Sequence, residues 1–211
     1  MTSLAVLLAL SDSRLPTGGH VHSGGVEEAV TSGLVTDLPT LRAFLRRRIR
    51  THGLVTASLA AAVHAGTLSV VDADRETDAR TPAPAARSAS RAQGRGLARL
   101  ARRVWPDRDW AAIGVKPHLA VAAGAVGDAS GMAPEQTALS VVYTTMTGSA
   151  TAAQRLLALD PGDVAAVTFE LSPLCDQTAA EAAKELADLS DPLLDTLAQR
   201  HVERDRPLFV S

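Results

Sequence analysis

Residues 10–30 read LSDSRLPTGGHVHSGGVEEAV and stand between two short apolar segments that are typical of helices. The stretch contains four glycines, one proline, two histidines, three serines and three acidic residues. A connection between helices commonly needs about 2–8 residues and one or two turn formers. This stretch holds more polar groups and more special backbone positions than a turn requires, which makes it the first candidate for function.

The composition around this stretch indicates an all-α protein. The 211 residues suit one domain, and 46% of them are hydrophobic, which is enough for a sizeable core. Only 3% are aromatic, and the chain is rich in Ala, Leu and Arg rather than in the aromatic and β-branched residues that favour strands. We predict a single-domain bundle of roughly eight to ten helices, packed closely through small side chains.

Charge and cysteine usage exclude several classes of protein. The formal net charge of −2 gives no overall attraction to nucleic acid or to an anionic membrane. The single cysteine, Cys175, cannot form an internal disulfide and is expected to be a small core residue. The apolar run Leu4–Leu10 is too short to span a bilayer and is a poor signal peptide, so a cytoplasmic protein is the default expectation.

Helix and turn signals divide the chain into segments. Asp37, Asp160 and Asp191, each near a proline, are expected to cap helices. A helix break is expected near Gly53, and Pro173 is expected to break or kink its helix. Helices are expected over residues 3–10, 25–32, 87–104, 118–128 and 134–159, after Asp37, and from 190 onward. Prolines at 82 and 84 predict a loop over 77–86, and the C-terminal tail (residues 203–211) is expected to be poorly ordered alone and to dock on a partner.

Nothing in the chain has the pattern of a catalytic centre. There is no phosphate-binding loop, dinucleotide-binding glycine pattern or nucleophile elbow, and Ser23 lies beside His22 only in sequence. His20 and His22 could bind a transition metal only if Asp12, Glu27 or His118 converged on them, because two ligands are too few for a tight site. The other interpretations of this pair are polar loop structure and a partner-binding surface.

Two arginine stripes leave a further alternative open. Arg42, Arg46 and Arg50 are spaced four residues apart, and so are Arg87, Arg91, Arg95 and Arg99. Such a stripe is typical of a solvated helix face, but it could also receive an acidic partner. A helical nucleic-acid binder is the least favoured interpretation, because the net charge is −2 and no aromatic residues are interleaved with the arginines.

The stretch first quoted resembles the opening motif of the UreF family of urease accessory proteins. The matching positions are Leu8, Ser11, Asp12, Leu15, Pro16, Thr17, Gly18, Gly19, His22, Ser23, Gly24, Gly25 and Glu27. Three later segments resemble the family in the same order: Arg87–Ser90 with Gly94 and Arg95, then Ala153–Leu156 with Leu159 and Asp163, and the tail residues 206–211. The chain departs from the pattern at His20, where the family more often has Phe or Tyr, and at Pro207.

The resemblance implies an all-helical adaptor, usually a homodimer, without catalysis of its own. It implies binding to a second accessory protein, UreD (also called UreH), and recruitment of the GTPase UreG. The assembly inserts nickel into apo-urease, and the adaptor couples or regulates GTP hydrolysis. No cofactor is expected on the chain itself, since nickel and GTP would be handled by the partners, and neither catalytic nor metal-ligating residues are assigned. The partner-binding residues expected from the motifs are Asp12, Pro16, Thr17, Gly18, His22, Ser23, Gly25, Glu27, Arg155, Arg206, Leu208 and Phe209.

A mechanism for these residues follows as a hypothesis. Asp12, His22 and Glu27, with the helix of Arg155, would present a polar surface to the GTPase. The tail would become ordered on UreD, where burial of Leu208 and Phe209 would offset the loss of chain entropy. Replacing Arg155 or Glu27 by alanine would then weaken recruitment without unfolding the protein. The rival hypothesis is a small transition-metal-binding protein that uses His20, His22 and His118.

Overall fold

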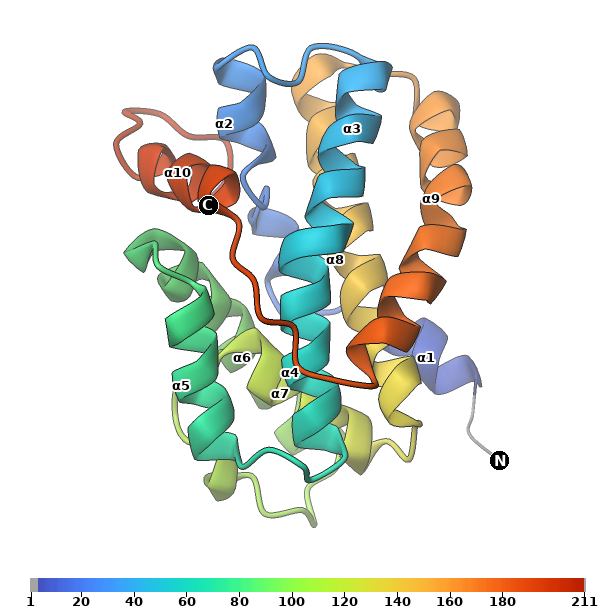
Figure 1. Cartoon of the computed structure of the whole chain (residues 1–211), viewed down its shortest axis with the longest axis vertical. Helices are drawn as coiled ribbons and strands as arrows, with labels where there is room; N and C mark the ends of the chain where they lie inside the picture. The colour runs from blue at the N-terminus through green and yellow to red at the C-terminus, as the bar shows by residue number, and fades with distance from the viewer. Residues whose placement is uncertain (1–3, 211) are drawn as a thin grey trace.

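The computed structural model describes residues 4–210, and within that range it consists of ten α-helices and no strand (Figure 1). The helices are α1 (Leu4–Leu10), α2 (Val26–Thr31), α3 (Leu38–Arg48), α4 (Leu54–His64), α5 (Val70–Arg80), α6 (Pro84–Val104), α7 (Leu119–Ala129), α8 (Pro134–Leu157), α9 (Pro161–Ala182) and α10 (Pro192–His201). Short helical turns lie at η1 (Gly19–Val21), η2 (Ile49–Gly53) and η3 (Ala111–Ile113). The all-α prediction is confirmed. Ser3 and Ser211, at the ends of the first predicted helix and of the tail, lie outside the described residues.

Helices α3 and α4 form the centre of the molecule. They run on through η2 as one long rod, with α8 and α9 packed along it (Figure 1). Helices α4 and α7 approach closely, since a side chain at Gly124 of α7 would collide with the carbonyl of Ala60 on α4. Small residues are buried on both helices, among them Ala57 and Ala60 on α4 and Ala120 and Ala123 on α7. The prediction of close packing through small residues is therefore met where the Ala-rich segments cross.

Buried apolar residues gather in two main groups. The larger joins α2, α3, α4, α8, α9 and α10, and its biggest buried side chains include Leu41, Leu45, Met146 and Leu171. Cys175 belongs to this group and lies 3.7 Å from the sulfur of Met146, as expected of a core cysteine. The smaller group joins α5, α6 and α7. None of the helices within residues 4–210 is both long enough and apolar enough to cross a bilayer.

Three helices begin at the aspartates that the sequence singles out. Asp37 forms a capping box with Thr40 at the start of α3. Asp160 accepts from the amides of residues 162 and 163, and Asp191 accepts from those of residues 193 and 194. In each helix a proline occupies one of the first two positions, where its missing N–H costs nothing.

Two expected breaks do not occur. At Gly53 the helix widens into the π-helical turn η2 and continues as α4 instead of ending. At Pro173 the helix α9 continues to Ala182. Pro173 is exposed, while Leu171, Leu174 and Cys175 on the other face are buried in the core. Burial of that face outweighs the one backbone hydrogen bond that the proline removes.

The loop predicted over 77–86 is shorter than expected. Helix α5 continues to Arg80, because Ala73 and Thr77 on its inner face are buried. Helix α6 begins at Pro84, where the fixed φ of proline suits a first turn. The connection is therefore only residues 81–83, and Pro82 is the one proline of the pair that acts as a helix breaker.

Candidate functional site: the first loop and the folded-back tail

The first loop (residues 11–25) lies between α1 and α2 and is held by contacts to distant helices. Arg14 and Asp12 form an exposed pair, 2.6 Å between Nη2 and Oδ2, whose hydrogen bonds lower the pKa of Asp12 to about 2. The carbonyl of Thr17 rests so closely on α6 that a side chain at Gly96 would collide with it. On α8, the hydroxyl of Ser149 donates to the carbonyl of Ser23, at 3.1 Å. The loop is therefore part of the folded structure.

The C-terminal tail folds back on its own chain. The amide of Val210 donates to the carbonyl of Val21 in the first loop, at 2.7 Å. Arg204 pairs with Glu28 of α2, 3.1 Å from Nη1 to Oε2. The ring of Phe209 is buried, with only 5% of the residue exposed, and belongs to the main core group. Contrary to the expectation of a poorly ordered tail, four residues of 203–210 have partners on the rest of the chain: Arg204, Leu208, Phe209 and Val210.

Glu27 is the residue that holds the tail in place. Its carboxylate accepts from the amides of Leu208 (2.7 Å) and Phe209 (3.1 Å) and lies 2.8 Å from Nε2 of His201. Burial, which leaves 3% of Glu27 exposed, raises its pKa. The hydrogen bonds from Leu208, His201 and Phe209 outweigh this effect, so that the net pKa of Glu27 is below its usual value. The carboxylate is thus charged and enclosed at neutral pH.

Arg155 covers the outer face of the docked ring. Its guanidinium carbon lies 5.3 Å from the centroid of the Phe209 ring, within the range of a cation–π contact. Arg155 is exposed and forms no ion pair with a carboxylate within residues 4–210. This position fits the surface location that the sequence-based mechanism expects of Arg155.

The predicted site residues divide into two groups by exposure. Eight of the twelve are exposed or half-buried and are therefore candidates for contact with a partner. They are Asp12, Pro16, Thr17, Gly18, His22, Arg155, Arg206 and Leu208. Four others are buried and cannot present themselves to a partner in this conformation. They are Ser23, Gly25, Glu27 and Phe209.

The burial of Glu27 and Phe209 corrects the surface hypothesis. Glu27 does not face outward with Asp12 and His22 but supports the tail from inside. Phe209 is buried against its own chain. The motif identified both residues, but a motif does not indicate whether a residue is buried or exposed. His201, which completes the arrangement, was missed, and a histidine in the last turn of a short helix gives no signal that could have found it.

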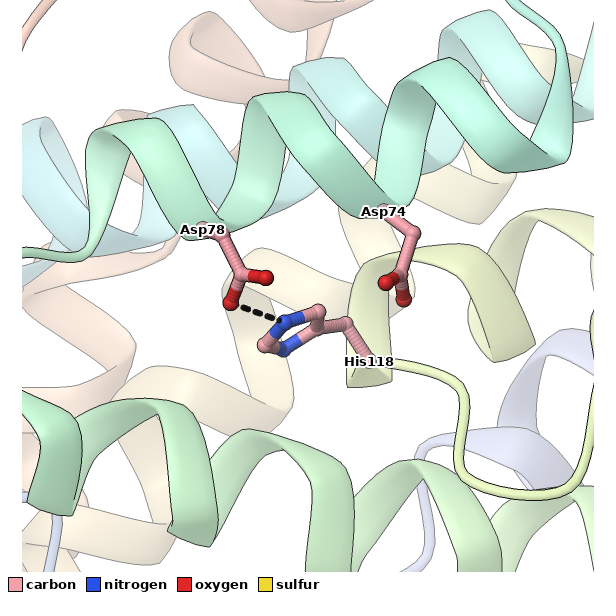
Figure 2. A group of neighbouring side chains, drawn as sticks. All are labelled: Asp74, Asp78 and His118. Atoms are coloured by element: carbon pink, nitrogen blue, oxygen red, sulfur yellow. Dashed lines mark hydrogen bonds and ion pairs between the residues drawn. The ribbon is translucent and has the colours of Figure 1, made fainter.

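A second polar cluster, formed by Asp74, Asp78 and His118, has the side-chain types of a metal site (Figure 2). Both aspartates project from α5 toward His118, which precedes α7. The cluster already contains a cation, since Arg91 of α6 lies 2.9 Å from Asp74 and 3.0 Å from Asp78.

The imidazole of His118 has no nitrogen left for a metal. It is fully buried, and burial lowers its pKa, so that the ring is neutral. Its Nε2 lies 2.9 Å from Asp78 and its Nδ1 lies 3.0 Å from the hydroxyl of Ser90. With Nε2–H donating to Asp78, Nδ1 accepts from Ser90. The cluster therefore fits a structural network that ties α5, α6 and α7 together.

The histidine site of the rival hypothesis is not assembled. Within residues 4–210 the one group of three or more metal-ligating side chains is the Asp74, Asp78 and His118 cluster, which includes neither His20 nor His22. His22 is half-buried near His20 and His201, and its pKa is lowered by burial and by these two neighbours. Asp12 and Glu27, the other residues expected to converge, are engaged with Arg14 and with the tail.

Comparisons with known proteins agree with the motifs. The profile of the UreF family matches residues 35–172, more than half of the chain. The chain is 79% identical over 214 residues to the urease accessory protein UreF of Mycolicibacterium vanbaalenii, and 79% identical over 211 residues to that of Mycobacterium sp. strain JLS. It is 74% identical over 211 residues to that of Mycobacterium tuberculosis. Each match covers 100% of both sequences. The chain therefore belongs to the UreF family.

Proposed function

We propose that the chain is a cytoplasmic urease accessory protein that acts as a non-catalytic adaptor. In this proposal it forms a homodimer, bridges UreD (UreH) and the GTPase UreG, and couples or regulates GTP hydrolysis during insertion of nickel into apo-urease. Full-length identity of 79% to proteins named urease accessory protein UreF is the observation that carries the proposal.

The folded-back tail provides a candidate surface for binding a partner. Arg206 and Leu208 are exposed on the tail, and Leu208 has 59% of its surface exposed although its amide is bound to Glu27. Beside them lie exposed residues of the first loop and Arg155 of α8. Because Glu27 fixes the backbone of residues 208 and 209, a partner would meet a preformed surface and would not have to order this part of the tail.

The test is size-exclusion chromatography with light scattering on the purified chain, alone and mixed with its cognate UreD and UreG. We expect a dimer that enters a larger complex with the partners. Truncation after Arg204 should abolish the larger complex, since it removes Arg206, Leu208 and Phe209 together. Absence of any association with either partner would contradict the adaptor function.

Truncation after Arg204 also removes the buried ring of Phe209 and exposes the core residues around it. A milder variant is therefore needed to separate loss of binding from loss of stability. Leu208→Ala removes an exposed side chain and keeps the backbone amide that Glu27 binds. It should weaken the complex and leave the melting temperature unchanged. Val202→Ala, at an exposed position on the same end of the chain, is the matched control and should bind normally. Equal affinity of the Leu208→Ala variant and the unaltered chain would exclude the tail as the contact surface.

A further inference from the structure

Arg48 brings a positive charge into the interior without a negative partner. It is the last residue of α3 and directly precedes the π-helical turn η2. Its Nη1 donates to the carbonyl of Gly24 at 2.7 Å, while its buried Nε has no hydrogen-bond partner. No carboxylate within residues 4–210 forms an ion pair with it. Asp191, the nearest acid that affects its charge, is already bound by Arg47 and Thr51.

The position of Arg48 is costly. Burial lowers the pKa of its guanidinium to about 10, against the opposing effect of Asp191. Guanidinium has five N–H donors, and leaving such donors unsatisfied away from water is unfavourable. The hydrogen bond to the carbonyl of Gly24 needs only one neutral N–H donor. It therefore does not explain why a charged side chain occupies this position. The loop is also shaped for this arginine, because Gly24 has a φ of +66° and a side chain there would collide with Nη2 of Arg48.

Arg48 faces a cavity whose acidic residues already have partners. Asp12 is paired with Arg14, Asp191 with Arg47, and Asp195 accepts from the amide of Ala83. The guanidinium lines this cavity of about 350 Å³ together with His52, Thr145 and Ser149. His52 lies four residues after Arg48, and burial lowers its pKa to about 3, so that its ring is neutral. Thr145 and Ser149 project from the same face of α8, four residues apart, and Ser149 touches the Arg48–Gly24 contact.

We propose that the part of the cavity beside Arg48 binds a small oxyanion. The planar guanidinium matches two oxygens of a carboxylate or phosphate, and the hydroxyl of Thr145 and the imidazole of His52 supply further donors. The hydroxyl of Ser149 is not among them, because it already donates to the carbonyl of Ser23. The cavity is near the lower end of the size range of small-molecule sites, which favours a free solute over a protein segment. The inference is independent of the adaptor function, since it concerns a ligand of this chain alone.

The experiment measures thermal unfolding of the full-length chain against the concentration of inorganic phosphate, with sodium chloride keeping the ionic strength constant. The unaltered chain should show a saturable rise in melting temperature. Arg48→Met should abolish the rise. Arg48→Lys keeps the positive charge but loses the planar guanidinium that can bind two oxygens at once. This variant should bind phosphate about tenfold more weakly. Arg46→Met removes an exposed arginine of the same helix and should keep the full rise.

Two results would overturn the proposal. One is an equal rise in Arg48→Met and in the unaltered chain; the other is no rise beyond that of sodium chloride. If Arg48→Met does not fold, the unaltered chain is labelled with ¹⁵N-arginine, and the Nε–H signal of Arg48 is assigned from its absence in Arg48→Lys. A saturable shift of that signal with phosphate supports the site, and an unmoved signal refutes it.

Discussion

Glu27 illustrates how one buried carboxylate can join distant parts of a chain. It lies in α2, and its three donors come from positions more than 170 residues later in the sequence. The carboxylate cannot be removed lightly, because its loss would leave buried amides without an acceptor and His201 without its partner. Contrary to the expectation from the sequence, we predict that Glu27→Ala destabilises the fold.

The Glu27 contact should depend on pH. The pKa of Glu27 in the folded protein is below its usual value of 4.5, so its stabilising effect is present above that pH and is lost as pH falls through the folded-state pKa. Glu27→Gln should lower the free energy of unfolding by about 1–3 kcal/mol at about pH 7. The gap between the variant and the unaltered chain should shrink at about pH 3.5.

Urea unfolding of both proteins at the two pH values measures this gap. Glu203→Gln, at an exposed position of the tail, serves as control and should change stability little at either pH. A gap of the same size at both pH values would mean that the charge of Glu27 does not hold the tail.

Motifs located the important residues better than they located their surroundings. The opening motif singled out Glu27, and the tail motif singled out Phe209, and the two prove to be in contact. The contact itself could not be predicted, because neither periodicity nor capping signals report on partners so far apart in sequence. Arg48 was not singled out at all, since an arginine in a run of three arginines is typical of a solvated face.

Helices were predicted well where local chemistry decides them. The caps at Asp37, Asp160 and Asp191 depend on a side chain and amides within three residues, which a sequence displays directly. The breaks expected at Gly53 and Pro173 do not occur, because packing overrides local preference there. Gly53 ends a π-helical turn in the central rod, and Pro173 lies on the exposed face of a helix whose opposite face is buried.

The interpretation of Pro173 leads to a prediction for α9. Since the helix already continues through this residue, Pro173→Ala should restore one backbone hydrogen bond without any repacking. We expect the free energy of unfolding to rise by about 1–3 kcal/mol, as measured by urea unfolding. Glu181→Ala, an exposed change to alanine in the same helix, is the control. A destabilised Pro173→Ala variant would show that α9 requires the proline.

At the scale of the whole molecule, part of the apolar surface of α1 stays uncovered. Helix α1 has no buried residue, and Leu4 and Leu8 are 66% and 71% exposed. Exposed apolar residues grouped on one element are typical of an interaction surface. We therefore propose α1 as the contact surface of the proposed homodimer.

Leu8→Asp should therefore shift the chain from dimer to monomer in light scattering while the circular dichroism spectrum stays helical. Val115→Asp changes an equally exposed apolar residue in a connection between helices and should leave the dimer intact. A Leu8→Asp chain that remains dimeric would place the dimer contact on another element.

The attachment of the tail to Glu27 also has a consequence for biosynthesis. The amides of Leu208 and Phe209 leave the ribosome 181 and 182 residues after the carboxylate that they satisfy. Until they have been made, Glu27 and His201 have no amides to enclose them, and the part of the core that Phe209 fills stays open. A nascent chain that stalls before residue 208 would therefore expose apolar surface, which chaperones and proteases recognise. Completion of this region of the core thus has to wait for a segment that is synthesised long after α2.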